Sequence, residues 1–172
     1  DSLSIIKTFD SILKMVPSDT TMLELKAAYM VLKKFPMHET NAALYRLLTF
    51  APNNKAPRIQ LLQNLVEEKK WQEILDVAQK GLDYDANETT FYYLKSIAYL
   101  QKDQLNEVIK TIQTGMKRLP KEPNSNLVSD LYAILGDCLQ KQHRIKEAFE
   151  AYDSCLQWNA NNIIASRYVE VV

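Results

Sequence analysis

Apolar residues recur along the chain at spacings that suit one face of an α-helix, and short polar segments separate these runs. The pattern is clearest where a polar turn at 140–144 separates two apolar stripes. The first stripe consists of Leu131, Tyr132, Leu135 and Leu139, and the second of Ala148, Tyr152, Cys155 and Leu156. Spacings of three and four residues place side chains on one helix face. The pattern predicts pairs of amphipathic helices joined by polar turns.

The pairs recur with a regular period. Pro17, Pro52 and Pro120 each follow a helical run, at steps of 35 and 68 residues, and Ala86 lies midway through the longer step. The flanking segments are alike: VPSD at 16–19, APNN at 51–54, DANE at 85–88 and NANN at 159–162. Each is typical of a turn, because Pro ends a helix and Asn or Asp caps the next one. The period is therefore about 34 residues, with one helical hairpin in each unit.

The last unit resembles a tetratricopeptide repeat (TPR). The residues that match the family pattern are Tyr132, Leu135, Gly136, Leu139, Ala148, Tyr152, Cys155 and Ala160. The preceding units match less completely, and in the first full unit only Ala28, Val31, Leu44 and Pro52 fit. This resemblance implies an all-α, right-handed solenoid of stacked hairpins, in which small residues allow close packing. In the repeat frame Gly81, Gly115 and Gly136 all fall at such positions.

The resemblance divides the chain, taken as one solenoid over 1–172, into about four full repeats with a half-repeat at each end. Residues 1–19 are the second helix of a truncated repeat, and 163–172 begin a further first helix. The full repeats are expected at 20–54, 55–88, 89–122 and 123–162. The last repeat carries about six extra residues around 121–126, either as a longer turn or as an extended helix start.

Composition removes several classes of function. The chain has 172 residues, equal numbers of acidic and basic side chains, and only three glycines, which are not clustered. Nucleotide-binding loops need clustered glycines, and nucleic-acid binding favours a basic face. Neither His38 nor His143, both expected in turns, has partners for catalysis or metal binding. We therefore expect no enzyme, cofactor, metal site, nucleic-acid partner, small-molecule substrate or transmembrane segment.

The remaining expectation is a non-catalytic scaffold that binds a protein or peptide segment along the concave groove formed by the first helices. The groove residues that the repeat frame predicts are Tyr29, Ile59, Gln63, Tyr93, Ile97, Asp130 and Asp137. The tyrosines are the expected anchors, because Tyr offers a large contact area at little entropic cost. The two aspartates are expected to meet a basic or donor-rich part of the partner.

Two alternatives stay open. The apolar residues of the first full unit, including Tyr29, are also explained by burial against neighbouring repeats or another copy. In that case the chain is a structural spacer of a larger multi-repeat protein, or a segment of that protein that self-associates through its end helices. Similarity to exported TPR arrays of Gram-negative bacteria favours a periplasmic or cell-envelope setting. The lysine and arginine clamp by which some TPR domains hold acidic chaperone tails is absent.

Overall fold

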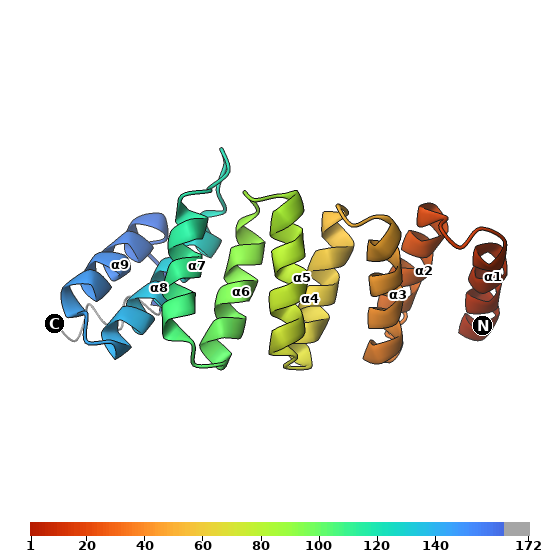
Figure 1. Cartoon of the computed structure of the whole chain (residues 1–172), viewed down its shortest axis with the longest axis horizontal. Coiled ribbons are helices and arrows are strands. Elements are labelled where there is room, and N and C mark those ends of the chain that lie inside the picture. Colours follow the sequence, from red (N-terminus) through yellow and green to blue (C-terminus); the bar gives the residue numbers. More distant parts are fainter. Residues whose placement is uncertain (164–172) are drawn as a thin grey trace. The chain divides into compact units, whose positions relative to one another are not determined.

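The computed structural model describes residues 1–163, which form nine α-helices and no strand (Figure 1). The chain divides into two compact units, the first comprising Asp1–Lys70 and the second beginning at Trp71. The division falls inside the repeat expected at 55–88. The start of a further helix was expected at 163–172, and all of this segment except residue 163 lies outside the described residues. None of the described helices has the length and apolar character needed to cross a membrane.

Unit 1 contains four helices, each packed against the next along the chain. They are α1 (Ser2–Met15), α2 (Thr20–Leu32), α3 (Met37–Phe50) and α4 (Lys55–Glu67). Asp19 caps α2, because its carboxylate accepts a hydrogen bond from the Met22 backbone N–H at 3.1 Å. The apolar core comes from α2, α3 and α4, whereas none of the residues of α1 is fully buried. His38 lies in the first turn of α3, so its expected position in the turn was wrong.

A buried polar network joins α3 to α4. The Asn64 amide donates to Asn41 Oδ1 at 2.9 Å, and the Asn41 amide donates to Glu68 Oε1 at 2.6 Å. Asn41 and Asn64 are both buried, and Gln60 donates to Asn64 at 3.0 Å. Buried amides are costly unless they are hydrogen-bonded. The network therefore fixes how α3 and α4 meet, because sliding one helix along the other would break it.

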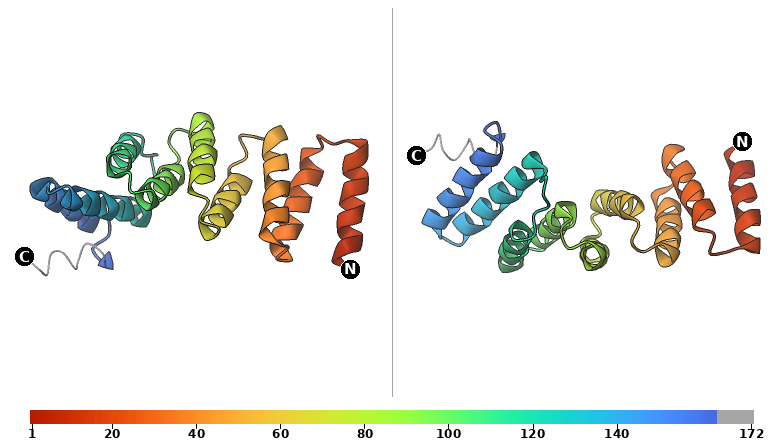
Figure 2. Two further views of the ribbon diagram at one scale, coloured as in Figure 1. Left: turned by 60° about the horizontal axis from the view of Figure 1, so that its bottom comes forward. Right: turned by 90° about the horizontal axis from the view of Figure 1, so that it is seen from above.

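Unit 2 contains five described helices around a larger apolar cluster. They are α5 (Trp71–Tyr84), α6 (Thr89–Gln101), α7 (Leu105–Met116), α8 (Ser125–Lys141) and α9 (Ile145–Trp158). Helices α8 and α9 lie side by side in both views of Figure 2. Between them Gly136 approaches the Tyr152 ring, which is 1% exposed. Cys138 and Cys155, on the same two helices, are buried free thiols.

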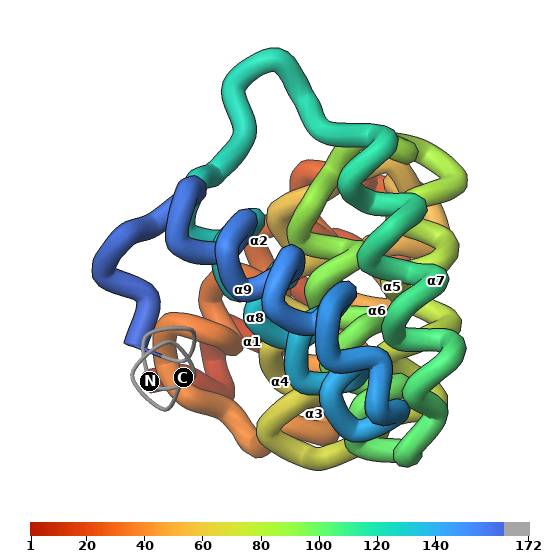
Figure 3. Tube along the Cα trace, turned by 90° about the vertical axis from the view of Figure 1, so that its left-hand side faces the viewer, coloured from red at the N-terminus to blue at the C-terminus, as the bar shows by residue number. Residues whose placement is uncertain are grey.

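The insertion expected around 121–126 is divided between a loop and a helix. Residues 117–124 form an eight-residue connection between α7 and α8, whereas four residues connect α5 to α6. Helix α8 has 17 residues and α6 has 13. The connection extends beyond the ends of the neighbouring helices (Figure 3). Asn124 ends it by accepting a hydrogen bond from the Leu127 N–H at 3.1 Å, which caps α8.

Four turns of identical geometry follow α2, α4, α6 and α8. Their central residues, Lys34, Lys69, Asp103 and His143, have φ between 54° and 60°. In each turn the next backbone N–H bonds to a carbonyl five residues earlier, as Arg144 does to Leu139 at 2.9 Å. These bonds form the Schellman motif that closes a helix C-terminus. Non-glycine residues enter this left-handed conformation at a cost, so the turns are set by tertiary structure rather than by residue preference.

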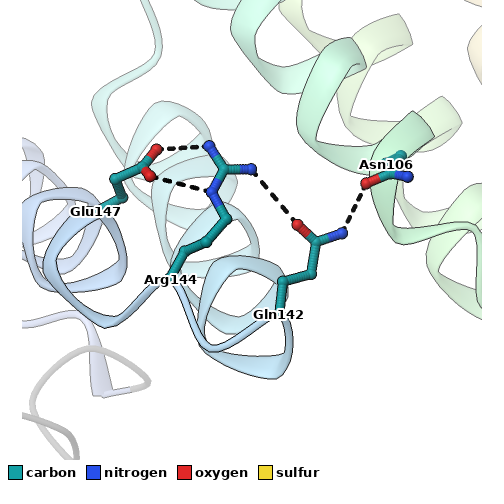
Figure 4. A network of polar contacts seen from close by, with 4 residues as sticks. All are labelled: Asn106, Gln142, Arg144 and Glu147. Atoms are coloured by element: carbon teal, nitrogen blue, oxygen red, sulfur yellow. Dashed lines mark hydrogen bonds and ion pairs between the residues drawn. The ribbon is translucent and has the colours of Figure 1, made fainter.

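Polar contacts also connect the ends of α6 and α8 to the preceding helix of unit 2. Lys102 Nζ donates to Gln72 Oε1 of α5 at 2.8 Å, and Gln142 Nε2 donates to Asn106 Oδ1 of α7 at 2.7 Å. Figure 4 shows the second contact, which continues through Arg144 to Glu147. Hydrogen bonding to Arg144 lowers the pKa of the Glu147 carboxyl. These exposed contacts recur at equivalent positions of successive hairpins.

Candidate functional site

The predicted groove residues fall in both units. Tyr29 of α2 and Ile59 and Gln63 of α4 belong to unit 1. Tyr93 and Ile97 of α6 and Asp130 and Asp137 of α8 belong to unit 2. All seven lie on the first helices of the expected hairpins.

In unit 1 the Tyr29 side chain is already engaged within the chain. Its hydroxyl donates to Ser2 Oγ of α1 at 3.1 Å. Its ring centroid lies 6.2 Å from that of Phe9 in α1 and 6.1 Å from that of Phe35. Helix α1 thus packs on the surface that Tyr29 was expected to offer, which reduces the ring area left for a partner.

The two α4 positions have more open surroundings. Ile59 is half-buried, whereas Gln63, one turn further along the same face, is exposed. The role of these two residues in binding stays a prediction.

In unit 2 four predicted residues share one face, which we name the α6–α8 face: Tyr93, Ile97, Asp130 and Asp137. Helices α6 and α8 are in contact, and Tyr93 and Ile97 pack partly against the apolar cluster of this unit. Burial raises the pKa of the Tyr93 hydroxyl, and the negative charge of Asp130 adds to this effect. Tyr93 therefore stays neutral beside Asp130.

Asp130 is oriented by Asn162, from the turn after α9. The Asn162 amide donates to Asp130 Oδ1 at 2.9 Å and to Ser129 Oγ at 3.0 Å, and it is 5% exposed. Ser129 in turn donates to the Cys155 carbonyl at 2.7 Å. The carboxylate is therefore held by a neutral donor.

Asp137 is held in a similar way by Tyr152 of α9. The Tyr152 hydroxyl donates to Asp137 Oδ1 at 2.6 Å and lies 3.1 Å from Gln140 Oε1. Neither Asp130 nor Asp137 forms an ion pair with any residue in the described part of the chain. Since both donors are neutral, they do not compensate the negative charge of these half-buried carboxylates, and such groups attract cations and hydrogen-bond donors.

Sequence reasoning placed the two aspartates on one helix face but missed Asn162 and Tyr152 as the residues that orient them. The only sequence signal for Asn162 is the NANN turn, and the family pattern explains Tyr152 by packing alone. Across residues 1–163, no cluster of three or more His, Cys, Asp and Glu side chains is arranged to hold a metal ion.

Comparison with known proteins identifies the fold. No protein-family model matches the chain, and no curated protein matches its sequence. Among solved structures it is similar to YrrB, described as a TPR protein with an unusual peptide-binding site. The TM-score is 0.73 at 15% identity over 98% of this chain and 84% of that one.

The chain is also similar to MamA. A crystal structure of MamA has a TM-score of 0.72 at 13% identity and covers 93% of this chain and 90% of its own. MamA from Desulfovibrio magneticus RS-1, from residue 41 to its end, has a TM-score of 0.67 at 15% identity, over 94% and 88%. These neighbours do not indicate a catalytic family. The chain therefore has the all-α helical-repeat fold of TPR proteins.

Proposed function

We propose that the protein is a non-catalytic interaction scaffold, and that the α6–α8 face binds a basic segment of a protein or peptide partner. The observation that carries the proposal is the pair of half-buried carboxylates, Asp130 and Asp137, which neutral donors hold, with Tyr93 near Asp130. A partner lysine or arginine would supply the positive charge that this face lacks. Tyr93 and Ile97 would contact the apolar part of the same segment.

Two features support this assignment. Helical-repeat proteins use their extended surfaces for binding, and YrrB, which shares the fold, is described as having a peptide-binding site. The donors from Asn162 and Tyr152 also hold the carboxylates in place before a partner arrives. Such preorganisation lowers the entropic cost of binding.

The test uses an array of capped peptides in which a central lysine or arginine is compared with glutamine. The full chain is probed beside Tyr93→Ala, Asp130→Asn and Asp137→Asn, with Asp153→Asn, an exposed carboxylate of α9, as the matched control. Asparagine still accepts the hydrogen bonds from Asn162 and Tyr152, so each Asp→Asn change removes charge while keeping the bond.

We expect the wild-type chain and Asp153→Asn to prefer basic peptides. Each α6–α8 variant should weaken that binding by about tenfold, which corresponds to about 1.4 kcal/mol. Equal binding of lysine and glutamine peptides by the wild-type chain would refute the proposal. So would wild-type affinity in both asparagine variants.

A second candidate function is self-association through α1, as expected for a structural segment. This helix exposes several large apolar side chains, including Leu3 at 67% and Met15 at 84%, together with Ile5 and Ile12. An exposed apolar helix face favours association. Light scattering of Ile5→Lys and Ile12→Lys, with Ser11→Lys as the polar control, tests this candidate. A dimer that only the isoleucine variants abolish supports it, and a wild-type monomer rules it out.

A further inference from the structure

Unit 2 contains a pocket that lies apart from the α6–α8 face and was not singled out from the sequence. It has a volume of about 490 Å³ and lies between α5 and α7, with α6 beneath it. Tyr92, Lys95 and Tyr99 form the α6 side. These residues, at spacings of three and four, share one helix face, whereas Tyr93 and Ile97 belong to another.

Lys95 lines this pocket from α6. Its Nζ donates to Gln79 Oε1 of α5 at 2.7 Å and lies 6.0 Å from the centroid of the Tyr99 ring. Burial lowers the pKa of its ammonium group, while the carboxylates of Glu107 and Asp83 raise it. The ammonium is therefore partly desolvated and held by one neutral acceptor, without a carboxylate in contact.

Two further cations line the α7 side. Lys110 and Arg118 both border the pocket, and neither forms an ion pair with a residue among 1–163. The charge of Lys110 also lowers the pKa of Lys95, so the two ammonium groups repel each other, although this effect is smaller than those of Glu107 and Asp83, which raise that pKa. An anion placed between them would remove this repulsion.

The other charges of the pocket restrict which anion suits it. Asp83 and Glu107 also line it, so three cations face two carboxylates and the excess is one positive charge. Asp83 accepts a hydrogen bond from Gln79 at 3.0 Å, which links it to Lys95 through the same amide. A singly charged carboxylate balances this excess, whereas a phosphate dianion exceeds it and is repelled more strongly by Asp83 and Glu107. The two tyrosines add aromatic surface for the alkyl part of a ligand.

We propose that this pocket binds an acidic side chain of a peptide, with its carboxylate between Lys95 and Lys110 and its carbon chain against Tyr92 and Tyr99. This site is independent of the α6–α8 face and has the opposite charge preference. A scaffold with both sites would contact an acidic and a basic segment on different faces of unit 2.

The test compares capped peptides with a central glutamate against the same peptides with glutamine, and uses the full chain. The variants are Lys110→Met, which changes an exposed side chain, and the double variant Lys95→Met/Lys110→Met. Lys80→Met, an exposed lysine of α5 outside the pocket, is the control. Thermal melts by circular dichroism check that each variant is folded.

We expect the wild-type chain and Lys80→Met to prefer glutamate peptides by tenfold or more. Lys110→Met should lose most of this preference and the double variant all of it, while Asp130→Asn keeps it. Failure of the α6–α8 proposal would leave this result unchanged. The inference is overturned if the wild-type chain shows no preference, if folded Lys110→Met keeps all of it, or if inorganic phosphate competes as strongly as the best glutamate peptide.

Discussion

Gly136 in the middle of α8 offers the sharpest test of the packing in unit 2. A Cβ atom at this position would lie 2.5 Å from Cε1, 2.7 Å from Cδ1 and 2.8 Å from Cζ of Tyr152. Each distance is far shorter than ordinary contact between carbon atoms, which is about 3.5–4.0 Å. The ring cannot move aside freely, because it is buried and its hydroxyl is bonded to Asp137. Even the single methyl group of Gly136→Ala therefore requires Tyr152 or the helices to shift.

The expected magnitude is the balance of one stabilising and two destabilising effects on the free energy of unfolding. Alanine gains up to about 1 kcal/mol over glycine inside a helix. Overpacking a buried contact costs about 1–3 kcal/mol. If the ring moves enough to break its bond to Asp137, the loss of a charge-assisted hydrogen bond adds about 1.5–3 kcal/mol. We expect Gly136→Ala to lower the free energy of unfolding by about 2 kcal/mol, which lowers Tm by roughly 4–8 °C in a chain of this size.

The assay is urea and thermal unfolding followed by circular dichroism, arranged as a double-mutant cycle with Tyr152→Leu. If the clash is with the ring, the double variant should be more stable than the sum of the single changes by about 1–2 kcal/mol. Gly115→Ala is the graded comparison, because its nearest contact, 2.9 Å to Cγ of Tyr92, is less severe. A Gly136→Ala protein as stable as wild type, or a cycle with no coupling, would refute the packing argument.

Three other residues give independent predictions. His143→Gly should stabilise the chain by about 0.5–1 kcal/mol, because His143 has a φ of 60° and glycine adopts this left-handed conformation without a steric cost. The control His143→Ala should not stabilise the chain. A loss of stability in His143→Gly would contradict the turn geometry. Asn64→Ala should lower the free energy of unfolding by about 2 kcal/mol, because the buried Asn41 Oδ1 loses the hydrogen bond that the Asn64 amide donates. Equal urea unfolding midpoints for Asn64→Ala and the exposed control Gln63→Ala would disprove this. Burial raises the pKa of the Cys138 thiol to about 11. Alkylation of this thiol at pH 8 should therefore be slow in the native protein and fast in urea, and rapid alkylation of the native protein would contradict this burial. The stability that the neutral thiol contributes should be lost as the pH rises from the ordinary thiol pKa through 11.

The sequence predicted the helical hairpins because their signals are local. Apolar spacing defines the helices, and the Pro, Asn and Asp residues of the turns mark where they end. Asp19 and Asn124 cap helices as such residues commonly do. Gly115 and Gly136, assigned to close-packing positions from the repeat frame, do lie where an added Cβ would meet a tyrosine ring.

The candidate site was less predictable, since it depends on contacts between residues far apart in sequence. The donor to Asp130 comes from Asn162, 32 positions along the chain. The left-handed turns at Lys34 and Lys69 also lack the glycine that usually signals them. The pocket around Lys95 was missed because its residues come from three helices and match no motif.

The weak family match of the first full unit has a physical explanation in the structure. Thr40 stands where the family pattern has alanine, and its hydroxyl donates to the Pro36 carbonyl at 3.3 Å. Beside it, the buried pair Asn41 and Asn64 contributes hydrogen bonds at the contact between α3 and α4. In unit 2 the contact between α8 and α9 depends on shape instead, because a glycine admits the ring of Tyr152. Hydrogen-bonded contacts do not need the small residues that define the repeat pattern, so α3 keeps its contact with α4 while its sequence departs from that pattern.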